Sequence, residues 1–271
     1  MDRAGFNPIS TLKGNFMLLS RKDVAEIQGW LRQAGKIALQ SQSSLKMTFK
    51  ADHTPVTDAE LRIENMIIEN IHQKFPTHQV LTEEQGVAGG KDDYLWVLDP
   101  VDGTKSFLRG LPTWGVSLGL LHQARPVAGF FYIPALKEMF WGSELGAFMN
   151  NSPLPRRVVY EESLSFLAVS ANAHLRFEID FPRLQAFGST AVHLSYLARG
   201  IAAGVLTRRI NLWDIAGFLP IFEQIGIACQ YLSGASIDLA ALLDGQKTPE
   251  PVLAARPDIL VDLRKRIHPR K

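Results

Sequence analysis

Asp99 and Asp102 stand three residues apart, directly after an apolar run, in a chain of 271 residues. Pro100 stiffens the turn between them, so both carboxylates can face one point, and Gly103 lets the backbone come close to a ligand. Two carboxylates at one point suit a hard cation with oxygen ligands, Mg²⁺ above all. A helix beginning after Gly103 would aim its free N–H groups at the same point and favour phosphate there. The pattern predicts adjacent cation and phosphate sites; the alternative is a turn whose aspartates only cap a helix.

Two more acidic segments supply candidates for the same site. Glu83 and Glu84 follow a short apolar pair, and Asp214 precedes an apolar segment that we predict to be a helix. Taken alone, adjacent glutamates are typical of a solvated loop, and an aspartate before a helix is typical of an N-cap. These acids become candidates for a metal site only in combination with Asp99 and Asp102.

Two helices are predicted before this acidic region. Apolar residues repeat at helical spacing behind Ser20, which predicts a first helix over residues 21–40. The segment Thr57-Asp58-Ala59-Glu60 has the spacing of a capping box, so a second helix begins there and continues until Pro76 stops it. Asp58 is therefore predicted to lie at a helix start.

Residues 80–149 change to short apolar runs divided by turn residues, which is typical of a largely antiparallel sheet. We expect this sheet to pack on the two helices. Its predicted strands are Tyr94–Leu98, Trp114–Leu121, Val127–Ile133, Met139–Trp141 and Gly146–Met149.

The remaining chain alternates strand-like and helical runs, as α/β proteins do. The predicted strands are Phe166–Val169, Ala202–Leu206 and Ile227–Leu232, and the predicted helices are Thr190–Arg199 and Ile215–Ile225. Pro153 and Pro155 interrupt the chain before these elements, which favours a boundary near residue 152.

This boundary divides the chain into three predicted parts. Residues 1–19 form an N-terminal extension, and residues 20–152 form an α+β sub-domain that binds metal and phosphate. Residues 153–271 form an α/β sub-domain that completes the metal and substrate site.

The composition, with 46% hydrophobic and 21% charged residues, indicates a globular chain. Its net charge of +2 lacks the basic excess that is typical of proteins that bind a nucleic-acid polymer. Cys229 is the only cysteine, so no intrachain disulfide can form and a cysteine-based zinc site is disfavoured. The apolar run Phe16–Leu19 is too short for a signal peptide or a membrane span, which favours a cytoplasmic enzyme without a membrane partner.

The order and spacing of these segments resemble the inositol monophosphatase superfamily of Mg²⁺-dependent, lithium-sensitive phosphatases. The resemblance covers residues 21–235 and is most specific over residues 99–107 and 213–217. It implies a fold between the α+β and α/β classes, a layered αβαβα sandwich of the sugar-phosphatase type with the active site between two sub-domains. It also implies hydrolysis of small phosphate monoesters by a water that Mg²⁺ activates, in a chain that pairs as a homodimer.

The residues that match the family carry its metal-binding roles over to this chain. The resemblance implies two or three Mg²⁺ ions, with Mn²⁺ as a substitute ion. The implied ligands are the side chains of Glu83, Asp99, Asp102 and Asp214 and the backbone carbonyl of Val101.

Catalytic and substrate-binding roles carry over in the same way. By resemblance, Asp58, Glu83 and Thr104 position the attacking water, and Asp102 and the amides of Gly103 and Thr104 contact the phosphate. The implied contacts to the rest of the substrate are Gly188, Ser189, Thr190, Ala191 and the residue at position 207, Thr207.

Substrate choice stays open because several positions depart from many relatives. A glutamate that binds sugar hydroxyls often stands where this chain has Thr207, followed by Arg208 and Arg209. These arginines either favour a substrate with extra negative charge, such as a bisphosphate, or are exposed surface residues without a role in substrate binding. Lys105 and Pro220 look more like histidinol-phosphate phosphatases, and Lys105 also occurs in bisphosphate nucleotidases. Histidinol-phosphate phosphatase and 3′(2′),5′-bisphosphate nucleotidase are therefore the alternatives to an inositol monophosphatase-like activity.

Two rivals come from other classes. A non-catalytic metal-binding regulator of the same fold would usually have lost a ligand, whereas every expected acid is present here. A nucleotide-dependent kinase is disfavoured because neither a G-x-x-x-x-G-K-[ST] nor a G-x-G-x-x-G string occurs. His193, on the helix after the predicted substrate loop, is assigned a structural role.

Overall fold

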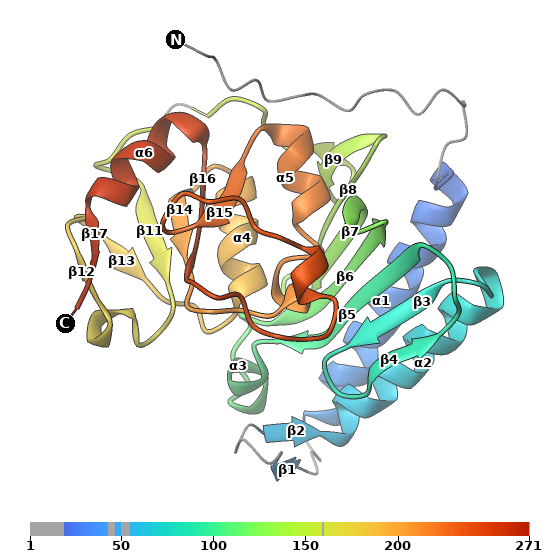
Figure 1. Cartoon of the computed structure of the whole chain (residues 1–271). Coiled ribbons are helices and arrows are strands. Elements are labelled where there is room, and N and C mark those ends of the chain that lie inside the picture. Colours follow the sequence, from blue (N-terminus) through green and yellow to red (C-terminus); the bar gives the residue numbers. More distant parts are fainter. Residues whose placement is uncertain (1–18, 43–46, 50–54, 159, 271) are drawn as a thin grey trace.

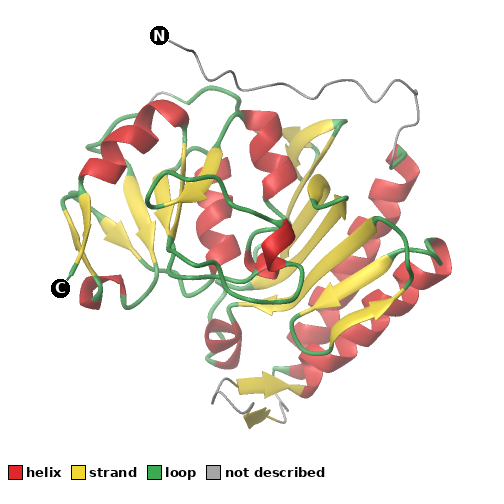
Figure 2. Cartoon of the chain, viewed as in Figure 1, coloured by secondary structure: helices red, strands yellow, loops and turns green. Residues whose placement is uncertain are grey.

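The computed structural model describes residues 19–42, 47–49, 55–158 and 160–270, whose helices and sheets stack in five layers. Two long helices cover one face of a large sheet, and a second pair of helices separates that sheet from a smaller one (Figure 1, Figure 2). One more helix covers the outer face of the smaller sheet. The predicted αβαβα sandwich is confirmed. The predicted N-terminal extension lies outside the described residues except for Leu19, which is buried.

The first layer contains α1 (Arg21–Ser41) and α2 (Asp58–Lys74), which begin where their sequences predict. Ser20 and Thr57 each accept a hydrogen bond from the amide three residues on, and an acidic side chain reaches back to close each capping box. The box at α2 turns Glu60 inward, where it is 2% exposed. No helix in the described part of the chain is long and apolar enough to cross a membrane.

The large sheet has eight strands in the order β10-β9-β8-β7-β6-β5-β3-β4, and all neighbours are antiparallel except β3 and β5. The strands are β3 (Gln79–Thr82), β4 (Gly86–Gly89), β5 (Tyr94–Asp102), β6 (Gly115–His122), β7 (Arg125–Ile133), β8 (Glu138–Ser143), β9 (Gly146–Met149) and β10 (Ser152–Pro153). The mostly antiparallel sheet is confirmed. The strands β3, β4 and β10 are additions to the prediction, and each is too short to show a clear alternation of apolar residues.

The central strand β5 continues past its apolar run as far as Asp102. Its pairing with β6 shifts register between Asp99 and Asp102, and such a bulge re-aims the side chains around it. Gly103 follows with a φ of +99°, and a Cβ at that residue would lie 2.9 Å from the Cβ of Ser189. The five-residue helix α3 (Thr104–Leu108) begins directly afterwards.

The smaller sheet has the strand order β13-β11-β14-β16-β15. Its strands are β11 (Phe166–Val169), β13 (Leu184–Gln185), β14 (Ala202–Leu206), β15 (Ala228–Tyr231) and β16 (Val252–Ala255). The middle layer contains α4 (Thr190–Ala198) and α5 (Leu219–Ile225), and the outer layer contains α6 (Pro257–Lys265). The remaining elements are two strand pairs, β1 (Met47–Phe49) with β2 (Pro55–Thr57) and β12 (Phe177–Ile179) with β17 (Ile267–Pro269), and the 3₁₀ helices η1 (Ala173–Leu175), η2 (Leu212–Asp214) and η3 (Ala240–Leu242).

The helix predicted over Ile215–Ile225 begins four residues later than expected, as α5. Pro220 has no N–H and stands in the first turn of α5, the part of a helix that tolerates proline. Gly217 packs against the backbone of the large sheet at Gly129, where a Cβ would collide with the Gly217 carbonyl. The apolar residues before α5 therefore form a turn that packs closely against the large sheet.

Candidate metal centre

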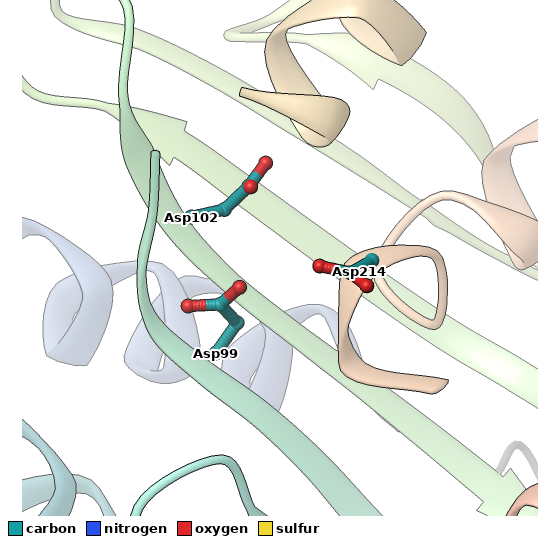
Figure 3. Close-up of side chains that lie close together, drawn as sticks. All are labelled: Asp99, Asp102 and Asp214. Atoms are coloured by element: carbon teal, nitrogen blue, oxygen red, sulfur yellow. The ribbon is translucent and has the colours of Figure 1, made fainter. Parts of the chain in front are cut away.

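Three aspartates from distant parts of the chain converge at the end of β5. Asp99 and Asp102 come from β5 and Asp214 from η2, and one carboxylate oxygen of each lies within 4.8 Å of those of the other two. Figure 3 shows the three side chains pointing toward a shared space. Asp99 and Asp102 are almost completely buried, at 2% and 6% exposure. The structure thus brings together three of the four acidic side chains that the sequence nominates as ligands.

Backbone amides orient two of these carboxylates. The Val101 amide donates to Asp99 Oδ1 at 3.0 Å, and the Asn211 amide donates to Asp214 Oδ2 at 2.7 Å. Asp214 is therefore the last residue of a short capped turn and not the N-cap of a long helix. A carboxylate offers about four lone-pair sites, so both side chains keep the capacity to bind a cation.

Burial is the largest cause of a raised pKa in all three aspartates. The pKa values of Asp99 and Asp214 lie well above their ordinary value, and that of Asp102 is raised to about 6 despite hydrogen bonds that favour its charged form. The charge of Glu83, in the turn after β3, adds to each of these shifts. A divalent cation would offset this repulsion, and a donor set made of oxygens alone fits Mg²⁺ or Mn²⁺ better than Zn²⁺.

The predicted substrate loop lies directly against Asp102. The Ser189 hydroxyl donates to Asp102 Oδ2 at 2.7 Å, and the Ala191 amide donates to the same oxygen. The Thr190 amide donates to Asp102 Oδ1 at 3.3 Å. Gly188 has a φ of +84°, so a residue without a Cβ lets the loop turn here. Asp102 therefore links the large sheet to the start of α4, in addition to its place among the three aspartates.

The hydroxyl of Thr104 contacts a buried glutamate. It lies 2.9 Å from Glu60 Oε1, to which it donates, and 3.3 Å from the carbonyl of Val101. Glu60 also accepts from the amide and the hydroxyl of Thr57, and burial raises the Glu60 pKa to about 7. Asp58 lies two residues before Glu60 with its side chain partly exposed. Its role with Thr104 stays a prediction.

A second buried glutamate supports the segment that carries Glu83. Glu64 is fully buried, and its Oε1 accepts from the Glu84 amide at 2.9 Å. Burial raises its pKa to about 7. Sequence reasoning missed Glu60 as a contact of Thr104 and missed Glu64 altogether.

The missed glutamates leave a signal in the sequence. Glu60 and Glu64 stand one turn apart in the same buried stripe of α2 as Ile63, Ile67 and Ile71. Carboxylates are rarely found at such positions unless they have a partner. Acids in an apolar stripe therefore indicate buried polar contacts.

Thr207 faces the protein interior. It is 2% exposed, and its hydroxyl lies 2.8 Å from the Arg208 carbonyl and 3.2 Å from the Val252 carbonyl. These contacts engage the hydroxyl as a donor, and the contact of Thr207 with the substrate stays a prediction. Arg208 and Arg209 are exposed, so charged side chains and not a hydroxyl border this part of the surface.

His193 has the structural role that the sequence suggests. It is 3% exposed, and its Nε2 accepts from the Phe187 amide at 2.8 Å, which fixes the residue before Gly188. Burial lowers the His193 pKa to about 4. The ring is therefore neutral at pH 7, with its proton on Nδ1.

Replacing His193 with Gln should make folding less sensitive to acid. Because the pKa is about 4 in the folded chain and 6.5 ordinarily, the stabilisation is present above pH 6.5 and is lost as the pH falls toward 4. Between pH 7 and pH 5 this loss amounts to about 2 kcal/mol of unfolding free energy, which the variant should escape. Urea unfolding of metal-stripped protein at both pH values measures it. Equal losses in the two proteins would contradict the assignment.

Comparison with known proteins places this site in a family. The sequence pattern described as the inositol monophosphatase family matches residues 21–264. A histidinol-phosphatase of Chlorobaculum parvum is 30% identical over 227 residues, covering 79% of this chain and 86% of the relative. A Nus factor SuhB of Pasteurella multocida is 31% identical over 261 residues, covering 88% of this chain and 92% of the relative. A solved IMPase/NADP phosphatase with Mg²⁺ and phosphate shares the fold, with a TM-score of 0.79 and 20% identity over 90% of this chain and 94% of that one. The chain belongs to the inositol monophosphatase family.

Proposed function

We propose that this protein is a Mg²⁺-dependent phosphatase that hydrolyses small phosphate monoesters. The observation that carries the proposal is the convergence of three carboxylates, two of them almost completely buried, beside Gly103, where the backbone can approach a ligand closely. Membership in the inositol monophosphatase family supports it.

The metal would be held by the acids that converge on the end of β5. The proposed ligands of two or three Mg²⁺ ions, or of Mn²⁺ in their place, are Glu83, Asp99, Asp102, Asp214 and the Val101 carbonyl. When bound, the metal supplies positive charge that offsets the charge of the phosphate and lowers the pKa of water. The chain's part is to hold the acids in fixed places, with Asp99 and Asp102 shielded from bulk water.

Thr104 is proposed to orient the attacking water. Because its hydroxyl proton is directed to Glu60, the Thr104 oxygen is left as an acceptor for a water proton. Thr57 anchors Glu60 in turn, and we assign Asp58 as a second acceptor for the same water. The amides of Gly103 and Thr104 would hold the phosphate group.

The substrate is proposed to differ from inositol monophosphate. The position of the sugar-binding glutamate is a buried threonine, and exposed Arg208 and Arg209 follow it. These two positive charges favour a substrate that carries a second negative group, as a nucleoside 3′(2′),5′-bisphosphate does. Histidinol phosphate is the other candidate, which the name of one relative supports.

A metal-binding regulator without turnover is the candidate from another class. The observation behind it is the relative named as a Nus factor. The presence of Asp58, Glu83, Asp99, Asp102 and Asp214 in this chain favours turnover. We further propose that the protein acts as a homodimer in the cytoplasm.

A phosphate-release screen tests the function. The esters are inositol 1-phosphate, histidinol phosphate, fructose 1,6-bisphosphate and adenosine 3′,5′-bisphosphate, each with Mg²⁺ and with excess chelator. We expect release from at least one ester with Mg²⁺ and none with chelator. No release from any ester would point to the regulator. A preference for inositol 1-phosphate of more than about a hundredfold in kcat/KM, or about 2.7 kcal/mol, would contradict the substrate assignment.

A further inference from the structure

A cavity of about 880 Å³ lies in the half of the molecule that contains the smaller sheet, and it includes none of the proposed metal ligands. Its lining comes from β12, β17, the segment after β14, the end of α6 and the loop between β15 and β16 (Figure 1). Phe177, Leu232 and Ile267 are buried apolar parts of the lining. A hollow of this size with an apolar lining is typical of a small-molecule site.

The charge around this cavity is strongly one-sided. Glu250 is the only acidic residue in the lining, and Ser233 donates to it from both its amide and its hydroxyl. The whole chain has a net charge of only +2, so the clustering is local. The basic residues of the lining are Arg176, Arg208, Arg209, Lys247, Arg264 and Arg270.

None of the six basic side chains forms a salt bridge with another residue that the structure describes. Arg209 Nε donates to the Thr248 carbonyl at 2.6 Å, and Arg270 Nε donates to the Phe177 carbonyl at 3.2 Å. A guanidinium has five N–H donors, so one anchored N–H leaves the others available to an anion. Within the described part of the chain, the buried Nε of Arg264 has no hydrogen-bond partner at all. Six basic side chains against one acid give the cavity an excess of positive charge that an anion would complement.

Part of the cavity lining stands close in the chain to a proposed metal ligand. Arg208 and Arg209 lie on the segment that leads to Asp214. The charge of Lys247 also reaches Asp214, where it acts against the larger effect of burial on the pKa.

We propose that this cavity binds a small organic ligand with at least two phosphate groups. The limited size of the cavity and the balanced charge of the rest of the chain favour such a molecule over a nucleic-acid polymer, which would need an extended basic face. The ligand is either the second phosphate-bearing part of the enzyme's substrate or a separate regulator. The assignment of the ligand as part of the substrate rests on the proposed function. The proposal that the cavity binds such a ligand does not depend on that function.

Calorimetric titration of metal-stripped protein with pyrophosphate tests the site. The chelator must be dialysed away first, because it is itself a polyanion. Without metal, the acidic centre repels anions, so saturable binding reports on the cavity. We expect pyrophosphate to bind more tightly than orthophosphate, and Arg176→Gln and Arg270→Gln each to weaken it by roughly tenfold. Arg125→Gln removes an exposed charge outside the cavity and is the matched control.

Several results would overturn the proposal. Absence of saturable binding, wild-type affinity for pyrophosphate in both cavity variants, or polyuridine RNA that binds through these arginines more tightly than pyrophosphate would each do so. Because the titration needs no turnover, its failure is separate from failure of the phosphatase assignment.

Kinetics of the same variants with Mg²⁺ distinguish the two sources. A rise in KM confined to the bisphosphate esters identifies the second phosphate of a substrate. If KM changes by the same factor for monophosphate and bisphosphate esters while pyrophosphate binding is weakened, the ligand is a separate regulator.

Discussion

Asp99→Asn should lower kcat by about a thousandfold or more while making the metal-free protein more stable. Asparagine keeps the shape and can still accept from the Val101 amide, but it removes one negative charge. The loss of metal-assisted stabilisation worth several kcal/mol accounts for the fall in kcat. The Asp99 pKa is raised in the folded state, so at pH 7 its charge opposes folding, and removing it should raise the melting temperature without metal.

Melting curves with and without Mg²⁺ complete this test. The Mg²⁺-induced gain in melting temperature should shrink in Asp99→Asn, because that gain reports binding to the native state. Asp93→Asn, an exposed acid before the other end of β5, is the control and should leave the gain intact. If Asp99→Asn stays active and responds normally to Mg²⁺ but melts much earlier, Asp99 is only a turn residue. Asp102 is less suited to this test, since its carboxylate also accepts three hydrogen bonds from the N-cap and the first two residues of α4.

Glu60→Gln should lower kcat by about a hundredfold with a smaller change in KM. A Gln side chain cannot accept from Thr104 and from Thr57 with both of its terminal atoms, so the Thr104 hydroxyl loses its fixed direction. Misplacing a reacting group by about 1 Å can cost about that factor. Glu69→Gln, exposed on the same helix, is the control and should match the wild type.

A double-mutant cycle separates this positioning role from a loss of fold. If Glu60 acts through Thr104, then Thr104→Val should remove most of the effect of Glu60→Gln on kcat. Additive effects of the two substitutions would show that Glu60 supports the helix start and not the hydroxyl. Circular dichroism of each variant checks that α2 still forms.

Local signals made the early elements predictable. The capping boxes at Ser20 and Thr57 determine where α1 and α2 begin. These patterns act within a few residues, so neighbouring sequence is enough to interpret them. The turn expected between Asp99 and Asp102 is wrong, because β5 continues through both residues with a bulge, but the two acids do lie at one strand end.

Contacts between distant segments were not predictable in the same way. Glu60 already has a complete local explanation in its capping box, so nothing nearby points to Thr104, 44 residues away. The turn before α5 is apolar because it packs on the sheet, and apolar content alone does not distinguish such a turn from a helix. The helix α6 did leave a signal that went unused, with Pro257 at its first position followed by Asp258.

The divided origin of the metal centre bears on the order of folding. Asp102 and Asp214 belong to segments separated by most of the smaller sheet, and Ser189 joins them from the start of α4. Closing such long stretches of chain costs entropy before any contact is gained, so these acids meet late in assembly. A cation that needs all of them binds only the finished chain and, by mass action, draws partly folded forms toward it. Mg²⁺ would then raise the fraction of chains that are folded, in addition to any part it has in turnover.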